Sequence, residues 1–210
     1  MELMSEVNLT CRVTQEALRN YVQFAERGRV VVIDTETTGI SNADEIIQFA
    51  AAEYVCGKLE RTLDLYLIPS CPIHPEAEAV HHITMPYLVE HGMQPSEALG
   101  RFFDFLGGNV LLVGHNIRFD FRMLQNSCRK YDFEFLPSEV SFCDTIAFAK
   151  KMVPGLDHYR LGYLIEALGI PGTNSHNALD DALACGELFF DLVRRVPISS
   201  DDYTYEPIFE

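Results

Sequence analysis

Two acidic residues follow an apolar run near the start of the chain. In "VVIDTETTGI", residues 31–40, Asp34 closes the run and Glu36 comes two positions later. Side chains two apart in a β-strand point to the same side, roughly 6.5–7 Å apart, so both carboxylates reach one small volume. A divalent cation removes the repulsion between them, and carboxylate oxygens suit Mg²⁺ or Mn²⁺. Taken alone, the pair also fits a plain strand end with a solvated Glu36.

Further acids stand where helices are expected to begin. In "VGHNIRFD" another apolar run ends, and Asp120 opens the helix that follows. A helix N-terminus favours an ionised carboxylate by a few tenths to about 1 kcal/mol. Near the C-terminus, "SHNALDDA" places His176, Asp180 and Asp181 around another helix start. Each group by itself also fits a first-turn acid or a helix cap, but three of them in one chain favour a shared metal site.

The elements that position these acids can be predicted from hydrophobic patterning. Strands are expected at residues 29–34, 45–55, 59–68, 109–116 and 139–144, the second and third forming a hairpin through the turn "CGK". Helices are expected at residues 14–27, 96–107, 119–131, 145–152, 160–170 and 177–195, with a short helical region at 79–92 after a proline-containing loop. This order predicts an α/β fold with a mixed sheet and helices on both faces. Ligands of such folds lie beyond the carboxyl ends of strands, where Asp34 stands.

Composition limits the classes of function. The chain of 210 residues fits one domain, and its net charge of −15 argues against non-specific coating of nucleic acid. The charge does not exclude an enzyme that meets a phosphodiester through metal ions. No apolar stretch approaches the roughly 20 residues of a membrane span, and the N-terminus lacks the pattern of a signal peptide. Six cysteines without a CxxC pair indicate reduced thiols, so a cytoplasmic protein with no membrane partner is expected.

Four short blocks, taken in order, resemble one family. "DTETTG", "HHIT", "GHNIRFD" and "HNALDDA" are similar to the motifs of the DEDDh-type 3′–5′ exonucleases, which include the proofreading epsilon subunit of bacterial DNA polymerase III. The resemblance covers residues 29–195, which are therefore expected to form the exonuclease domain. Residues 1–28 would supply an N-terminal helix, and residues 196–210 an acidic, loosely ordered tail.

The resemblance implies a ribonuclease H-like fold, a mixed five-stranded sheet and a two-metal hydrolysis of phosphodiester bonds. It implies two divalent ions, Mg²⁺ or Mn²⁺, with His176 as general base and four carboxylate ligands: Asp34, Glu36, Asp120 and Asp181. A helical wheel mildly favours Asp180 over Asp181, because His176 and Asp180 stand four residues apart. The family spacing favours Asp181, since His176 is expected to precede the regular helix.

The family pattern also implies contacts to the substrate, the 3′ end of single-stranded DNA or RNA. The contact residues that the pattern implies are Thr37, Gly39, Ile40 and His81. Asn116 and Phe119 are expected as stacking or supporting residues beside the substrate, and they fit a strand-end turn and a core position equally well. Gly39 would allow close backbone approach, whereas His82 has no match in the pattern and is expected at the surface. Through the epsilon-like members, a DNA polymerase subunit is an expected partner.

Other functions are compatible with parts of this pattern. A ribonuclease H-like endonuclease shares the carboxylate chemistry, but the His-x4-Asp element favours an exonuclease. A non-catalytic nucleic-acid- or polymerase-binding module would not need all five key positions. A mononuclear zinc hydrolase lacks support, because no HExxH or HxH pattern occurs. An RNA-processing exoribonuclease is the alternative that the sequence cannot separate from a DNA enzyme.

Overall fold

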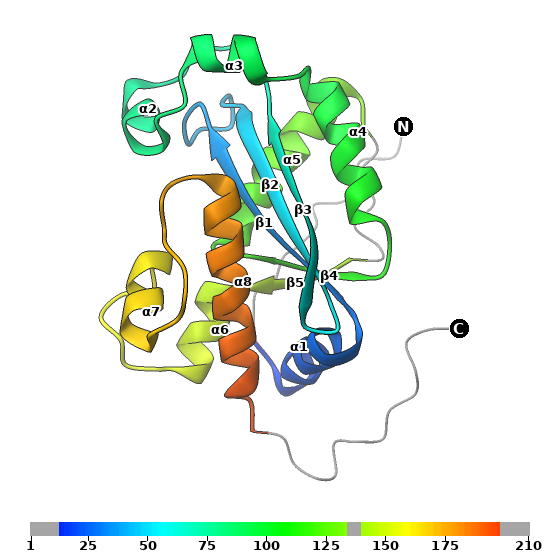
Figure 1. Cartoon of the computed structure of the whole chain (residues 1–210), viewed down its shortest axis with the longest axis vertical. Helices are drawn as coiled ribbons and strands as arrows, with labels where there is room; N and C mark the ends of the chain where they lie inside the picture. The colour runs from blue at the N-terminus through cyan, green and yellow to red at the C-terminus, as the bar shows by residue number, and fades with distance from the viewer. Residues whose placement is uncertain (1–12, 134–139, 198–210) are drawn as a thin grey trace.

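A five-stranded mixed sheet forms the centre of the protein (Figure 1). The computed structural model describes residues 13–133 and 140–197. The strand order is β3-β2-β1-β4-β5; β1 pairs antiparallel with β2 and parallel with β4. The strands are β1 Arg29–Thr37, β2 Ile46–Val55, β3 Lys58–Tyr66, β4 Val110–Gly114 and β5 Val140–Asp144. The predicted mixed sheet, its five strands and the β2–β3 hairpin are confirmed.

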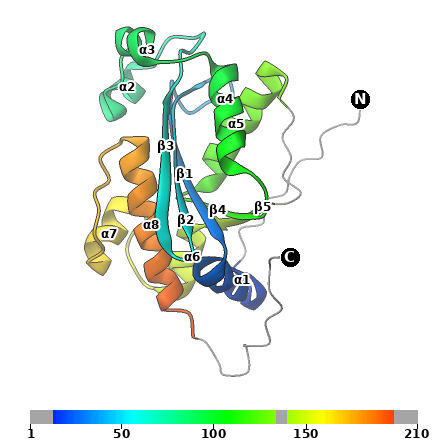
Figure 2. The ribbon, with the colours of Figure 1, turned by 45° about the vertical axis from the view of Figure 1, so that its right-hand side comes forward.

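Helices cover both faces of this sheet, as predicted (Figure 2). One face packs against α1, α6, α7 and α8, and the other against α4 and α5. The short helices α2 and α3 lie beyond one end of the sheet (Figure 1). The helices are α1 Gln15–Arg27, α2 Pro75–His81, α3 Met85–His91, α4 Pro95–Leu106, α5 Ile117–Tyr131, α6 Thr145–Met152, α7 Leu161–Leu168 and α8 Ala178–Arg194.

The region between β3 and α4 differs from the prediction. The expected single helical region at residues 79–92 consists of two helices, and the first begins already at Pro75 in the expected loop. Proline suits the first helical position, because its N–H would have no intrahelical partner and its φ is preset. His82, with φ of 59°, then turns the chain between the two helices.

The central strand β1 is buried on both faces. Val30 and Val32 pack in the core that contains α1 and α8, whereas Val31 and Ile33 pack in the core of α4 and α5. All four side chains are at most 1% exposed, so this strand needs no polar alternation. The alternation continues along the strand and directs Asp34 and Glu36 to the face that α8 covers.

The ends of the chain are described only in part. Within the expected N-terminal segment, α1 contributes Leu18, Tyr21 and Val22 to the main core, and the Thr14 side chain caps it by accepting from the Ala17 N–H. Residues 1–12 and all but the first two residues of the expected tail lie outside the described residues. The division at residues 28 and 195 therefore stays a prediction. None of the helices in the described ranges has the length and apolar character that a membrane span requires.

Candidate functional site

Three of the four predicted metal ligands converge at one end of the sheet. Asp34 and Glu36 from β1 and Asp181 from α8 each offer a carboxylate oxygen, and these oxygens lie within 4.8 Å of one another. Asp34 and Glu36 are half-buried and Asp181 is 5% exposed. The cluster brings together carboxylates from two elements that are almost 150 residues apart in sequence, so that one cation could be bound by both elements.

A buried amide places the start of α8 beside β1. Gln48 of β2 lies opposite Glu36 in the strand register and is fully buried. Its Oε1 accepts a hydrogen bond from the Ala178 N–H at 3.1 Å, and its Nε2 donates to Asp64 and to the Tyr66 hydroxyl. Sequence reasoning missed this residue, although a single amide inside the apolar run "IIQFAAA" was a usable signal.

The two adjacent acids of α8 have different surroundings. Asp181 accepts hydrogen bonds from Asn174 Nδ2 at 2.6 Å and from the Ser175 N–H at 2.9 Å. Asp180 is exposed and accepts from the Ser175 hydroxyl. The carboxylate that faces β1 is therefore that of Asp181, the acid which the family spacing favours.

Asp120, the fourth predicted ligand, lies close to the three clustered carboxylates but forms its hydrogen bond with a different residue, Thr35. It is 3% exposed in the first turn of α5 and accepts a hydrogen bond from Thr35 Oγ1 at 2.7 Å. Its charge helps to raise the pKa of Asp34, yet it is not among the three residues whose oxygens gather within 4.8 Å. Thr35, which sequence analysis had not singled out, thus links β1 to the first turn of α5.

The carboxylates of the site resist ionisation together. Burial, followed by the charges of Asp120, Asp181 and Glu36, raises the pKa of Asp34 well above its ordinary value. Burial and the charges of Asp181 and Asp120 raise the pKa of Glu36 to about 8, and burial raises that of Asp120 to about 7. A cation of charge two offsets both the burial and the repulsion. The all-oxygen donor set therefore fits a hard divalent cation.

His176 lies in the loop before α8. It is exposed, has φ of 54°, and precedes the helix N-cap Asn177. Burial raises the pKa of Asp181, against the opposing effects of the hydrogen bond from the Ser175 N–H and of nearby His176. The expectation that His176 stands outside the regular helix is confirmed, and its role as general base stays a prediction.

A cavity of about 550 Å³ adjoins the carboxylate cluster through Glu36. It is lined by five of the six residues predicted at or beside the substrate: Thr37, Gly39, Ile40, His81 and Phe119. Further lining residues that sequence reasoning did not single out are Thr35, Ser41, Asp44, His74, Glu76, Ala77 and Val80. The sixth, Asn116, does not line it; Asn116 is the exposed N-cap of α5, and its N–H donates to Asp144 Oδ1.

Close packing explains the glycine at position 39. A Cβ added there would lie 2.7 Å from His74 Cδ2 and 2.8 Å from the Asp44 carboxyl group. A side chain at this position would therefore collide with His74 and Asp44 of the same chain. This is a structural reason for the glycine, in addition to the expected close approach of a ligand. Next to it, Ile40 is 82% exposed, so a large apolar side chain stands free at the rim of the cavity.

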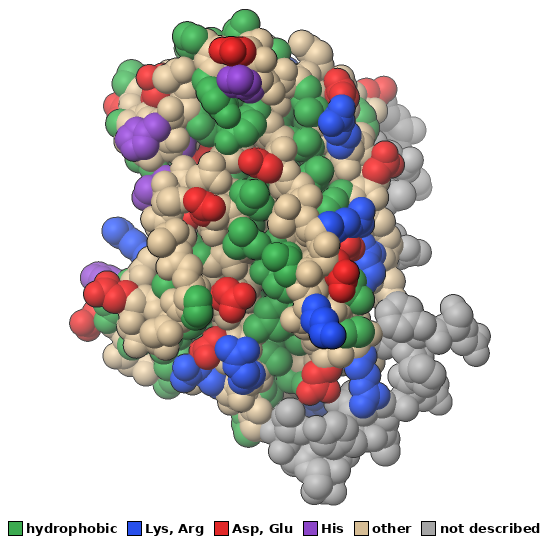
Figure 3. Space-filling view, viewed as in Figure 1, with side chains coloured by type: hydrophobic (Ala, Val, Ile, Leu, Met, Phe, Trp, Pro, Cys, Tyr) green, Lys and Arg blue, Asp and Glu red, His purple; other side chains and the backbone are tan. Residues whose placement is uncertain are grey.

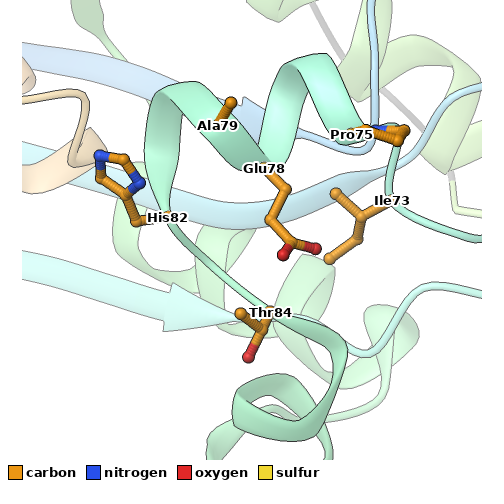
Figure 4. Close-up of a pocket in the computed structure, with 6 residues that line it drawn as sticks. All are labelled: Ile73, Pro75, Glu78, Ala79, His82 and Thr84. Atoms are coloured by element: carbon orange, nitrogen blue, oxygen red, sulfur yellow. The ribbon is translucent and has the colours of Figure 1, made fainter.

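The two histidines of "HHIT" point to different places. His81 is buried, and its Nδ1 accepts from the Ile83 N–H at 2.9 Å, which leaves the proton of the neutral ring on Nε2. Burial lowers the pKa of His81 against an opposing effect of the Thr37 backbone, and Nε2 makes no hydrogen bond of standard geometry in the described part of the chain. His82 is exposed, as expected, and lines a separate cavity of about 430 Å³ with Ile73, Pro75, Glu78, Ala79 and Thr84 (Figure 4).

Charges are distributed without a continuous basic surface on the face that Figure 3 presents. Acidic and basic side chains alternate over the lower half, and histidines gather over the upper part, where α2 and α3 lie (Figure 3). This face agrees with the net charge of −15, which argues against an extended electrostatic track for nucleic acid.

Comparison with known proteins identifies the family. A model of the RNase_T family, described as exonuclease, matches residues 31–189. The chain is 32% identical over 173 residues to DNA polymerase III subunit epsilon of Treponema pallidum, covering 76% of this chain and 74% of that protein. It is 33% identical over 171 residues to the 3′–5′ exonuclease DinG of Bacillus subtilis, covering 80% of this chain and 18% of that protein.

The chain matches only part of some relatives and shares its fold with a solved exonuclease structure. The chain spans only 12–13% of the length of several PolC-type DNA polymerase III proteins that it resembles. The zinc-bound complex of Escherichia coli ExoI with single-stranded DNA has a TM-score of 0.70 at 22% identity, covering 80% of this chain and 40% of that one. This likeness confirms the predicted ribonuclease H-like fold. With a family model that spans most of its length, the chain belongs to the RNase_T family of exonucleases.

Proposed function

We propose that this protein is a metal-dependent 3′–5′ exonuclease that removes nucleotides from single-stranded nucleic acid, with DNA as its substrate. The observation that carries the proposal is the position of Glu36, which belongs to the carboxylate cluster and also lines the 550 Å³ cavity. A cavity of this size is in the range of small-ligand pockets. Its volume suits a single terminal nucleotide, as an exonuclease requires.

Each part of the site then has a task. Asp34, Glu36, Asp120 and Asp181 would hold two divalent ions, Mg²⁺ or Mn²⁺, which lower the pKa of the attacking water and offset charge on the leaving oxygen. His176 would then serve as the general base for that water, a task for which imidazole is suited near pH 7. The cavity orients the terminal nucleotide so that its phosphodiester faces the carboxylates.

His81 supports this assignment by its geometry. Its Nε2 carries a proton, is buried and makes no hydrogen bond of standard geometry among the described residues, and the ring lines the cavity. A ligand oxygen that accepts from this Nε2 would give it the well-aligned partner that the protein alone does not provide. We therefore assign His81 as a hydrogen-bond donor to the terminal nucleotide.

The preference for single-stranded DNA rests on relatives. Similar proteins include an ExoI whose structure holds single-stranded DNA and an epsilon subunit of DNA polymerase III. By the same likeness, a DNA polymerase subunit is the proposed partner and proofreading the proposed context, in the cytoplasm. RNA 3′ ends are the alternative substrate.

Digestion of matched 5′-labelled DNA and RNA oligomers tests the proposal. With Mg²⁺ or Mn²⁺, the DNA oligomer should shorten one nucleotide at a time, and EDTA should abolish the reaction. Asp34→Ala should remove activity while the protein stays folded, because loss of one repelling carboxylate favours the metal-free protein. Circular single-stranded DNA should remain intact. Cleavage of the circle would indicate an endonuclease, hydrolysis of RNA alone would exclude proofreading, and undiminished activity in EDTA after dialysis would refute the metal mechanism.

A further inference from the structure

The loop that carries Gly39 and Ile40 is closed upon itself. This 38–45 loop, residues 38–45, begins and ends with a mutual pair: the Thr38 N–H donates to the Glu45 carbonyl, and the Glu45 N–H donates to Thr38 Oγ1. Within the loop, the Asp44 carboxylate accepts from Thr38 Oγ1 at 3.0 Å and from the Ser41 N–H at 2.7 Å. These bonds define the shape of the loop, and on one side Thr37 Oγ1 of β1 anchors it by donating to the Gly39 carbonyl at 2.6 Å.

Three side chains of α5 hold this loop from outside. Arg122 Nη2 donates to the Ile40 carbonyl at 3.0 Å, and Asn126 Nδ2 donates to the Asn42 carbonyl at 3.3 Å. Lys130 Nζ donates to Glu45 Oε1 at 2.8 Å. The spacing of four residues places all three side chains on one face of the helix, and they meet the loop at three successive points.

Arg122 joins two walls of the cavity. While it holds the Ile40 carbonyl, its guanidinium lies 5.3 Å from the centre of the Phe119 ring. Ile40 and Phe119 both line the 550 Å³ cavity, but they come from segments about 80 residues apart. Asp120 follows Phe119 in the first turn of the same helix. The helix that carries a predicted metal ligand therefore also fixes the rim of the cavity.

We infer that Arg122 is a positioning residue that sets the distance between the nucleotide cavity and the metal site. Asn126 and Lys130 support it by holding the same loop. The inference rests on the proposed function and deepens it, because it names how the substrate wall is held. Arg122 acts through Ile40 and Phe119 and does not itself contact the substrate. Its loss lets the 38–45 loop move, so the terminal nucleotide binds more weakly while the carboxylate cluster remains unchanged.

Steady-state kinetics on a 5′-labelled single-stranded DNA oligomer with saturating Mn²⁺ test the inference. Loss of one charged hydrogen bond and one cation–π contact at an exposed site predicts a rise in KM of about fivefold to tenfold in Arg122→Met. The kcat should stay within about twofold. Arg122→Lys, which keeps a charged donor but not the planar group, should recover part of the loss. Arg129→Met removes an exposed charge from the same helix that makes none of the three hydrogen bonds to the loop, so it should resemble the parent.

A double-mutant cycle separates positioning from direct contact. If Arg122 acts through Ile40, then Arg122→Met should change KM by less than twofold in an Ile40→Ala background. Additive effects of the two substitutions would mean that Arg122 does not act by placing the Ile40 side chain, and would overturn the inference. Should Arg122→Met lower the melting temperature strongly, Asn126→Ala removes another of the three contacts and carries the same cycle.

Hydrogen exchange distinguishes failure of this inference from failure of the proposed function. Amides of the 38–45 loop should exchange about fivefold to tenfold faster in Arg122→Met than in the parent or in Arg129→Met, whether or not the protein hydrolyses DNA. A parent without hydrolytic activity but with this change in exchange would refute the exonuclease proposal alone. Equal loop exchange in all three proteins would refute the positioning role.

Discussion

Glu36→Gln should stabilise the metal-free protein, and increasingly so as the pH rises. The pKa of Glu36 is 4.5 in an ordinary environment and about 8 in the folded protein, because burial and the charges of Asp181 and Asp120 disfavour the carboxylate. Between pH 4.5 and 8 the unfolded chain releases this proton and the folded protein retains it. Raising the pH therefore favours unfolding, and the stability that is present below pH 4.5 is lost up to about pH 8.

The magnitude follows from the size of the shift. Each pH unit across this window costs the folded state about 1.4 kcal/mol per group, which would approach 5 kcal/mol for a group shielded from water. Glu36 is only half-buried, so solvent screening reduces its cost to on the order of 2–3 kcal/mol. For a protein of this size, that difference corresponds to a gap in melting temperature of about 5–10 °C at pH 8. Near pH 5 the gap should almost vanish.

Melting curves of the parent and of Glu36→Gln, both in EDTA from pH 5 to pH 8, provide the measurement. The comparison needs the variant, because burial lowers the pKa of His115 to about 4 and makes stability rise with pH below 6.5 in both proteins. Taking the difference cancels that contribution. Asp180→Asn, which removes an exposed acid, should follow the parent at every pH. Mn²⁺ should close the gap by binding the folded parent, whereas parallel melting curves across the range would refute the electrostatic reasoning.

Three further outcomes are expected. Asp181→Asn should abolish hydrolysis of a DNA oligomer at saturating Mn²⁺, and Asp180→Asn should stay within a few-fold of the parent; the reverse ranking would mean that the predicted ligand is misplaced. His176→Ala should lose roughly 10²–10⁴-fold in rate with unchanged Mn²⁺ affinity by titration, and a joint loss of affinity would make it a ligand instead. Gln48→Leu should lower the free energy of unfolding by about 1–3 kcal/mol in urea, because the Ala178 N–H loses its buried partner. An unchanged urea midpoint would contradict the role of Gln48 in placing α8 beside the sheet.

The layers of this fold could be predicted from the sequence because its strands are continuous apolar runs. A strand such as β1, apolar at every position from Val30 to Ile33, has to be buried on both sides, which already requires helices on both faces. The start of α2 at Pro75 was not predicted, since proline was taken as a loop signal although it also favours the first helical position.

The comparison of Asp180 with Asp181 shows why a helical wheel was insufficient. The wheel related His176 to Asp180 on the assumption that both belong to one regular helix. In the structure α8 begins at Ala178, and His176 has φ of 54°, so the angle of 100° per residue does not extend to it. The contacts of Gln48 and Thr35 could not be predicted either, because each depends on a partner that only the tertiary fold brings near.

The position of the site on β1 also has an energetic reason. Four fully buried aliphatic side chains of this strand, Val30 to Ile33, contribute on the order of 6–12 kcal/mol by leaving water. That contribution exceeds the few kcal/mol by which the neighbouring carboxylates destabilise the metal-free protein. A rigid, doubly buried strand can therefore hold repelling acids close together before a cation arrives, which an exposed loop could not do. Neutralising Asp34 or Glu36 relieves part of this repulsion, so it should remove activity without unfolding the protein.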